Sequence, residues 1–446
     1  MTVSINVAGN SELSVCINLE GEEPWTISGH CPSGLETRAK EWVRLGVQRV
    51  FQRAYQLTPS PWGTLTGVRP TKLVHSLYDD GNSWPEIKET LQTLYGLNPE
   101  KAELLVHVAQ GQRAFFHPNP NDPIGVYVGI PFCPTRCSYC SFAAYPLGTH
   151  GHLLKGFLAA LHSELKGIGA LIRELGLKVE SVYLGGGTPT TLVGSDLGDL
   201  LDLIRHEIFT QETIEYTVEA GRPETLSLES LQILKDAGVQ RISINPQTMH
   251  DQTLQAIGRE HTVADVHRAF SQARQVGIPI INMDIILGLP GEELGHVEHT
   301  LREISRLGPD NLTVHSLSLK RASRLKNSRS EVSIAHAQGE AMVHMARDVA
   351  FSLGMTPYYL YRQRHILGGL ENIGYARPNQ SSIYNVQMME ERQTIIALGG
   401  GGITKFVAPD LTLFRHANPK CPAGYSQQIK ESLTEKVAQL RQHLTA

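Results

Sequence analysis

Six short runs of apolar and β-branched residues recur between residues 125 and 318, separated by longer segments with helical periodicity. This alternation is typical of βα units, which build a parallel sheet covered by helices. Six such units predict an α/β fold, a partial (β/α)6 barrel of the TIM type, with functional residues at the carboxyl ends of its strands. The predicted strands are Val126–Ile130, Val179–Leu184, Ile214–Glu219, Gln240–Asn245, Pro279–Leu287 and Leu312–Leu317.

Three parts are expected because 446 residues exceed the size of a single core, which stops growing at about 250 to 300 residues. We assign residues 1–120 to an N-terminal α+β accessory module and helical linker, residues 121–320 to the barrel, and residues 321–446 to a C-terminal cap. Prolines at 118, 120 and 123 mark the first boundary. The stretches outside the barrel with strand or helix periodicity are Val3–Val7, Leu13–Leu19, Leu35–Leu57, Thr71–Gln112 and Ile334–Leu353.

The charge balance narrows the classes of partner. With 40 Lys and Arg against 44 Asp and Glu, the net charge is -4, and nucleic acid is an unlikely partner because its binders usually carry a basic stripe. The N-terminus lacks the basic and apolar segments of a signal peptide, and no run of about 18 apolar residues suggests a membrane span. We therefore expect a cytoplasmic protein without a membrane partner.

Three of the six cysteines fall within eight residues, as Cys133, Cys137 and Cys140. A reducing cytosol keeps such thiols free for metals or catalysis. Three thiolates on one loop can hold an iron–sulfur cubane and leave its fourth iron without a protein ligand. The alternative is a structural zinc site, but zinc usually takes four protein ligands, and the sequence offers no second cysteine pair.

The residues around these cysteines resemble the radical S-adenosylmethionine (SAM) superfamily, and within it the oxygen-independent coproporphyrinogen III dehydrogenases, called HemN-like. The resemblance covers roughly residues 124–320. The flanking segments Pro61–Lys72 and Tyr358–Gln363 are similar to the HemZ branch of that family. The matching motifs are Tyr127–Cys133, Tyr139–Cys140, Leu184–Thr190, Tyr216–Glu219, Arg241–Gln247, Gly258–Glu260 and Asp284–Pro290.

The resemblance implies a [4Fe-4S] cluster on the three cysteines and one or two bound SAM molecules. Each implied SAM contact also has a plainer interpretation: the glycines make a tight turn, Glu219 is a solvated acid, Asp284 is paired structurally, and the tyrosines pack beside the loop. The residues that match the family's SAM positions are Tyr127, Tyr139, Gly186, Gly187, Thr188, Glu219, Gln247, Arg259 and Asp284.

The activity that the resemblance implies is oxygen-independent conversion of coproporphyrinogen III to protoporphyrinogen IX, a step of haem and porphyrin biosynthesis. An external electron donor such as flavodoxin or ferredoxin would reduce the cluster, and SAM would break into methionine and a 5′-deoxyadenosyl radical. The radical would take a hydrogen atom from a propionate of the tetrapyrrole. Loss of carbon dioxide and one electron would leave a vinyl group, and two propionates would consume two SAM.

Two positions depart from the HemN pattern. Gly129 stands where that branch has histidine, and Phe142 stands where it has a further cysteine. The Cys-x-Phe variant also occurs in the haem-chaperone branch, HemW, so a cluster-containing haem-binding or haem-transfer protein is an alternative. A radical SAM enzyme that modifies RNA is a further alternative, which the net charge of -4 does not favour.

Other reactive side chains have plainer interpretations. We expect His296 and His299 on an outer helix, without a third metal ligand. The remaining cysteines are expected as small buried apolar residues, and they are Cys16, Cys31 and Cys421. Four cations either meet substrate carboxylates or lie on the surface, and they are Lys320, Arg321, Arg362 and Lys405.

Overall fold

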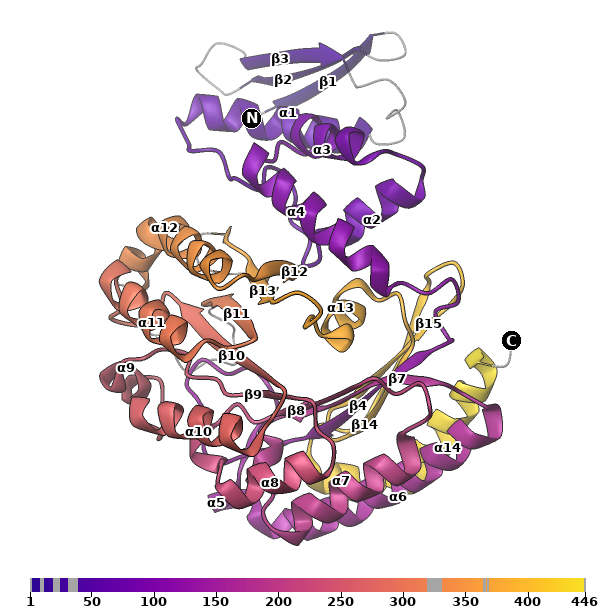
Figure 1. Cartoon of the computed structure of the whole chain (residues 1–446). Helices are drawn as coiled ribbons and strands as arrows, with labels where there is room; N and C mark the ends of the chain where they lie inside the picture. Colours follow the sequence, from indigo (N-terminus) through magenta and orange to yellow (C-terminus); the bar gives the residue numbers. More distant parts are fainter. Residues whose placement is uncertain are drawn as a thin grey trace. The chain divides into compact units, whose positions relative to one another are not determined.

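The computed structural model describes residues 2–8, 12–18, 25–30, 39–318, 331–363, 366 and 369–444 (Figure 1). The chain forms two compact units. The first comprises Met1–Gly111 with Leu360–Arg362, and the second comprises Gln112–Tyr359 with Gln363–Ala446. The three clustered cysteines and the strand ends that are predicted to carry chemistry all lie in the second unit. The three-part division at residues 120 and 320 stays a prediction.

The first unit combines a three-stranded antiparallel sheet with helices, as expected for an α+β module. The long helical stretch 71–112 is three helices, because two turns interrupt it. The second of these begins with a capping box in which the Ser83 backbone N–H donates to Glu86 Oε2 at 2.8 Å. The elements are β1 (Thr2–Ala8), β2 (Glu12–Asn18), β3 (Trp25–His30), α1 (Ala39–Ala54), α2 (Thr71–Asp79), α3 (Trp84–Thr93) and α4 (Pro99–Gln112).

The second unit is built on one eleven-stranded sheet, and all six predicted barrel strands are present in it. They are neighbours in chain order, and the pairings between them are parallel. Their side chains are almost entirely buried, as expected for a parallel sheet. The strands are β4 (Ile124–Ile130), β7 (Val179–Gly186), β8 (Glu215–Glu219), β9 (Arg241–Ser243), β10 (Ile280–Leu287) and β11 (Asn311–Ser316).

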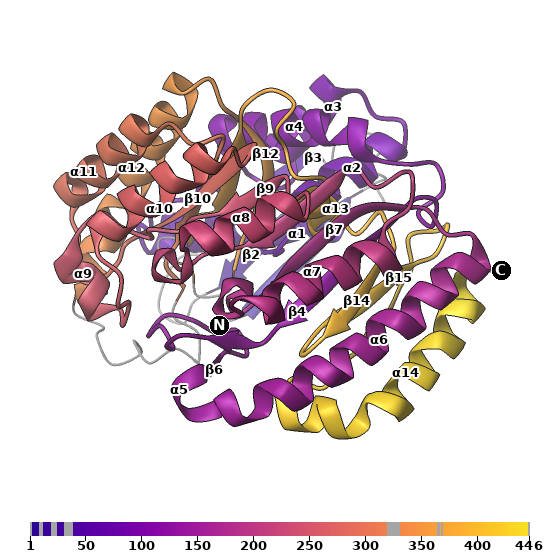
Figure 2. The ribbon, with the colours of Figure 1, turned by 60° about the horizontal axis from the view of Figure 1, so that its bottom comes forward.

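Helices cover the outer face of this curved sheet (Figures 1 and 2). One of them, α6, ends at Gly176, whose left-handed backbone (φ 62°) stops the helix. The partial barrel predicted from periodicity is therefore confirmed. The connecting helices are α6 (Leu154–Leu175), α7 (Ser195–Ile208), α8 (Leu228–Asp236), α9 (Asp251–Ala256), α10 (Val263–Val276), α11 (Leu294–Leu307) and α12 (Glu331–Ser352), with the short turns η2 (Arg113–Phe115), η3 (Gly151–Leu153), η4 (Pro189–Thr191) and η5 (Pro223–Thr225).

The C-terminal third extends the barrel sheet at both edges. Strands β12 (Thr356–Tyr361) and β13 (Asn372–Ala376) follow β11 at one edge. At the other edge β14 (Ile395–Gly399) pairs in parallel with β4, and β15 (Ile403–Val407) and β16 (Leu413–Ala417) continue the order. Helix α13 (Ile383–Glu390) lies on the concave face (Figure 1). This part of the chain thus supplies edge strands of the sheet and a helix on its concave face.

A fully buried ion pair fixes the turn after β14. Glu164 on α6 and Lys436 on α14 (Pro422–Leu444) have side chains with 0 % exposure. Glu164 also accepts from the Gly399 N–H at 2.8 Å and from the Tyr425 hydroxyl at 2.5 Å. Because Gly399 ends the strand beside β4, this pair sets one wall of the site described next.

Candidate active site

The cysteine loop begins at the end of the short strand β5 (Phe132–Cys133), which pairs with β6 (Tyr145–Pro146) ahead of α5 (Leu147–His150). The Ser138 N–H and hydroxyl both bond to the Ile257 carbonyl, at 2.9 and 3.1 Å. Within the described ranges, no three metal-binding side chains are arranged to hold a metal ion. The loop lies at the predicted strand end.

The surroundings of these thiols fit a cationic cluster. Burial raises the pKa of the Cys133 thiol to about 11, and the two other cysteines raise it further, while Thr188 and Arg222 oppose them. Thiolates crowded in this way need positive charge, which iron supplies. The Thr188 hydroxyl lies 3.5 Å from Cys133 Sγ, and Arg222 Nη1 donates to Cys137 Sγ at 2.9 Å. Both contacts would stabilise deprotonated sulfur.

Three tyrosine rings form a stack on the concave face of the sheet. Tyr127 on β4 and Tyr183 on β7 are parallel neighbours, and Tyr384 comes from α13. The ring centroids of Tyr183 and Tyr384 lie 4.2 Å apart, and Tyr127 lies 6.2 and 6.0 Å from the other two. Tyr127 therefore packs against aromatic rings, as in its plainer interpretation, and its contact with SAM stays a prediction.

Glu219, at the end of β8, is the acid that faces this stack. The Tyr183 hydroxyl donates to Glu219 Oε1 at 2.7 Å, and the Gly186 N–H donates to Oε2 at 3.2 Å. Burial raises the pKa of Glu219 to about 7, helped by the charge of Asp284 and opposed by the two hydrogen bonds. Glu219 is therefore half-buried and bonded, and the solvated-acid interpretation is wrong.

The glycine run after β7 packs tightly against the cysteine loop. Gly186 has a φ of 110°, and a Cβ there would lie 3.0 Å from the Ile130 carbonyl oxygen. A Cβ on Gly187 would lie 2.3 Å from the Phe132 carbonyl oxygen and 3.0 Å from Cys133 Sγ. The close turn alone therefore requires glycine at both positions. Their contact with SAM stays a prediction.

Asp284 and Gln247 lie together deeper in the barrel. Asn282 Nδ2 donates to Asp284 Oδ1 at 2.7 Å, and His315 Nε2 lies 3.7 Å from Oδ2. Burial raises the pKa of Asp284, but the bonds from His315, Asn282 and Thr313 outweigh it and leave the pKa below its ordinary value. The Gln247 N–H donates to the Asp284 carbonyl oxygen, while Gln247 Oε1 is buried without a hydrogen bond.

Arg259 holds the loop tyrosine. Its Nη1 donates to the carbonyl oxygens of Gly221 and Asn245 at 2.9 and 2.7 Å, and its Nε and Nη2 donate to the Tyr139 hydroxyl at 3.3 and 3.2 Å. Burial raises the pKa of Tyr139, so the hydroxyl stays protonated. In this structure Arg259 and Tyr139 are bonded to each other, and their contact with SAM stays a prediction.

A large cavity opens beside the loop, with a volume of about 1120 Å³. Its lining combines the tyrosine stack and Glu219 with the chain that follows the last loop cysteine. Phe142 on that segment is 69 % exposed. Of the predicted SAM residues, Tyr127, Gly186 and Glu219 line this cavity. The basic residues in the lining are Arg136, His150, Lys405 and Lys420.

Several other expectations can be compared with the structure. His250 packs beside the two helix histidines, with ring centroids 4.9 Å from His296 and 4.8 Å from His299, although its Nε2 contacts the His296 carbonyl oxygen. The expectation of a buried Cys421 was wrong: it is exposed in the turn before α14. Cys16 is half-buried, and Cys31 lies outside the described residues.

The four candidate cations differ in their surroundings. Lys405 is buried, lies 3.1 Å from Glu391 Oε1 and lines the cavity. Arg362 belongs to the first unit, where its guanidinium carbon lies 4.6 Å from the Trp62 ring centroid. Neither is a solvated surface cation. Lys320 and Arg321 lie outside the described residues.

Sequence reasoning missed three residues behind the loop: Arg222 and His261, which are buried, and Glu224, whose side chain is 20 % exposed. They follow the two motifs that end at Glu219 and Glu260, so charged residues just beyond strand and helix ends were the available signal.

No helix in the described ranges has the length and apolarity needed to cross a membrane.

Comparison with known proteins places the chain in a family. The profile of the Radical SAM superfamily matches residues 127–304. The chain is 42 % identical over 421 residues to "Oxygen-independent coproporphyrinogen-III oxidase-like protein HemZ" of Bacillus subtilis, covering 92 % of this chain and 84 % of that protein. It is 38 % identical over 192 residues to the "Heme chaperone HemW" of Bacillus subtilis, covering 43 % of this chain and 49 % of that protein.

Among solved structures, the fold resembles the coproporphyrinogen III oxidase HemN of Escherichia coli. The TM-score is 0.55 at 22 % sequence identity, and the match covers 73 % of each chain. This likeness supports the barrel fold. The identity to HemZ extends over both the barrel and its flanking segments. The chain therefore belongs to the radical SAM superfamily, in the family of HemZ-like proteins, whose chemistry uses a [4Fe-4S] cluster and SAM.

Proposed function

We propose that the protein converts coproporphyrinogen III to protoporphyrinogen IX without oxygen, with Cys133, Cys137 and Cys140 as the ligands of its cluster. The reaction removes one hydrogen atom, one carbon dioxide and one electron from each of two propionates, and a one-electron acceptor takes the electron. When bound and reduced by an external donor such as flavodoxin or ferredoxin, the cluster supplies the electron that cleaves SAM. The chain's part is to position the reactants and exclude water.

The observation that carries this proposal is the cavity beside the cysteine loop. Its volume of about 1120 Å³ exceeds the roughly 300 to 1,000 Å³ that is typical for small-molecule sites, which leaves room for a substrate larger than most. Aromatic rings of the tyrosine stack offer flat apolar contact to a tetrapyrrole. Arg136 and Lys420 are exposed in its lining, where they can pair with propionate carboxylates.

Glu219 is the residue that we assign to SAM on this wall. Its carboxylate lies at the barrel mouth beside Gly186, and a ligand ammonium or hydroxyl can take the place of the Tyr183 contact. Gly187 and Thr188 adjoin Cys133, so SAM bound there would lie against the cluster. The remaining proposed contacts are Tyr127, Tyr139, Gln247, Arg259 and Asp284.

The test is an anaerobic assay of protein reconstituted with iron and sulfide, supplied with SAM, a chemical reductant, coproporphyrinogen III and a one-electron acceptor. The proposal predicts one methionine for each vinyl group formed, which is two SAM per tetrapyrrole. Cleavage of SAM without any vinyl product would contradict the assignment of substrate. A variant with serine at all three loop cysteines is the control, and it should cleave no SAM.

A second candidate is haem binding and transfer, supported by the identity to heme chaperones and by Phe142 in place of a further cysteine. An exposed phenylalanine at the cavity offers a contact for a flat macrocycle. This candidate predicts haem uptake at one equivalent per chain and no vinyl product. Haem titration followed by absorbance, run on the same preparation as the assay, separates the two functions.

A further inference from the structure

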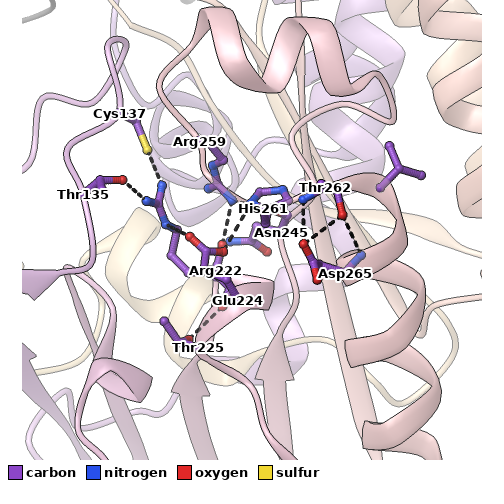
Figure 3. A network of polar contacts seen from close by, with 12 residues as sticks. Thr135, Cys137, Arg222, Glu224, Thr225, Asn245, Arg259, His261, Thr262 and Asp265 are labelled. Atoms are coloured by element: carbon purple, nitrogen blue, oxygen red, sulfur yellow. Dashed lines mark hydrogen bonds and ion pairs between the residues drawn. The ribbon is translucent and has the colours of Figure 1, made fainter.

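Two buried arginines contact the cysteine loop, and Figure 3 shows one of them, Arg222, at Thr135 and Cys137. Arg222 comes from the loop after β8, and Arg259 comes from the loop after α9. They are 3 % and 6 % exposed. Arg259 bonds to two backbone carbonyls and to the Tyr139 hydroxyl. The terminal nitrogens of Arg222 bond instead to the Thr135 hydroxyl and to the sulfur of Cys137.

Arg222 bridges two positions of the loop. Its Nη1 donates to Cys137 Sγ at 2.9 Å, and its Nη2 donates to the Thr135 hydroxyl (Figure 3). The guanidinium group is a rigid fork of donors with a permanent charge, so two contacts fix its plane. A charged N–H aimed at sulfur is about twice as strong as a neutral one when the sulfur is a thiolate.

A second layer of charge holds Arg222 in place. Its Nε lies 2.9 Å from Glu224 Oε1, and Glu224 Oε2 lies 3.3 Å from His261 Nδ1. Burial raises the pKa of Glu224. His261 and Arg222 have the larger opposite effect and bring the pKa down to about 2, so the carboxylate stays charged. None of these contacts has hydrogen-bond geometry, because Arg222 Nε, both Glu224 oxygens and both His261 ring nitrogens have no hydrogen-bond partner. The anchoring is therefore electrostatic.

We propose that Arg222 is a positioning residue for Cys137, held by Glu224 and His261, and that its hydrogen bond to the sulfur raises the reduction potential of the cluster. The inference rests on the proposed assignment of Cys137 as a cluster ligand. Hydrogen bonds to cluster sulfurs and nearby positive charge stabilise the reduced, more negative state. Arg222 thus makes the cluster a weaker reductant than the bare loop would, while keeping the middle cysteine in place.

The test is the midpoint potential of the cluster in anoxically reconstituted full-length protein, measured by redox titration followed by electron paramagnetic resonance. Arg222→Gln should shift the potential to a more negative value, because it removes the charge and the fork. Arg222→Lys keeps the charge and should shift it less, in the same direction. Arg302→Gln, the same change at an exposed arginine paired with Glu298 on α11, should leave it unchanged.

The outcomes separate this inference from the proposed function. An unchanged potential in Arg222→Gln, with the cluster present, overturns the inference and leaves the cluster assignment intact. If Arg222→Gln loses iron while its apo form melts like the wild type, positioning is supported. If Arg222→Gln loses both iron and fold, the test passes to Arg222→Lys. A midpoint potential equal to that of the wild type in Arg222→Lys then overturns the inference. Wild-type protein without a cluster signal would instead contradict the proposed function.

Discussion

Two buried charged networks flank the site, and they differ in how fully they are bonded. In the scaffold network, Glu164 accepts from Lys436, Tyr425, Asn418 and the Gly399 N–H, and Lys436 also donates to a backbone carbonyl. In the loop network, which consists of Arg222, Glu224 and His261, several polar atoms have no hydrogen bond.

The difference indicates what each network does. A fully bonded buried pair rigidifies the elements that it joins, here α6, α14 and the turn after β14. Buried polar atoms that are joined by ion pairs without hydrogen-bond geometry, as in the loop network, are costly and persist where function keeps them. The loop network ends at a thiol, which changes charge when a metal binds. We therefore assign stability to the first network and cofactor chemistry to the second.

The largest expected effect is in the scaffold network. Lys436→Met leaves Glu164 charged and uncompensated with 0 % exposure, so the free energy of unfolding should fall by about 3 to 5 kcal/mol. Urea denaturation of the apo protein measures it. The double variant Glu164→Gln with Lys436→Met should cost less than the single change. If Lys436→Met lowers the free energy of unfolding by less than about 1 kcal/mol, the assignment of stability to the scaffold network is contradicted.

The next effect depends on pH and concerns Glu219. Its pKa is raised from 4.5 to about 7 in the folded protein. The stability it contributes is therefore fully present below pH 4.5 and is lost as the pH rises through 7. Relative to Glu219→Gln, the wild type should lose at most about 3 kcal/mol across this window, because each tenfold change in proton affinity is worth about 1.4 kcal/mol. Denaturation at pH 4.5 and 8 tests this, and a constant difference between the two proteins would contradict it.

A smaller effect is expected where the scaffold network meets the site. A Cβ on Gly129 would lie 2.9 Å from the Gly400 carbonyl oxygen, in the turn that Glu164 holds. Gly129→Ala should therefore cost about 1 to 3 kcal/mol of unfolding free energy. Gly148→Ala is the matched control, since a Cβ there meets nothing within 4 Å. Equal stability of the two variants would show that the turn at Gly400 moves aside for a Cβ on Gly129 at little cost in free energy.

The smallest effect on stability is expected in the cysteine loop. Cys137→Ser keeps an acceptor for Arg222 and should change the unfolding free energy of the apo protein by less than about 1 kcal/mol. The same change should abolish retention of the cluster, measured as iron per chain after desalting. A large loss of stability without iron present would mean that the loop belongs to the scaffold.

The barrel could be predicted from sequence because its strands are local and buried on both faces, so each reads as an apolar run. The cysteine loop could also be found from sequence, because its three cysteines lie within eight residues of one another. The edge strands β14 to β16 were missed because they are short, and because β14, which joins them to the barrel, pairs with β4 across more than half the chain.

The site was predicted only in part. Tyr384 joins Tyr127 and Tyr183 from a helix some 200 residues away, and no periodicity signals such a contact. Arg222 lies 85 residues from Cys137 in sequence, yet bonds to its sulfur. Tertiary packing alone brings these residues together. The plainer interpretations of the glycine run and of Asp284 describe their contacts in the structure, as a tight turn and a bonded carboxylate.

The most direct measurement is the Mössbauer spectrum of anoxically reconstituted protein, recorded with and without SAM. The account predicts a cubane of four irons in which one iron changes its signal when SAM binds, because three cysteines leave that iron open. A spectrum without a cubane, or the same cluster in a variant with Cys133, Cys137 and Cys140 all replaced by serine, would contradict it.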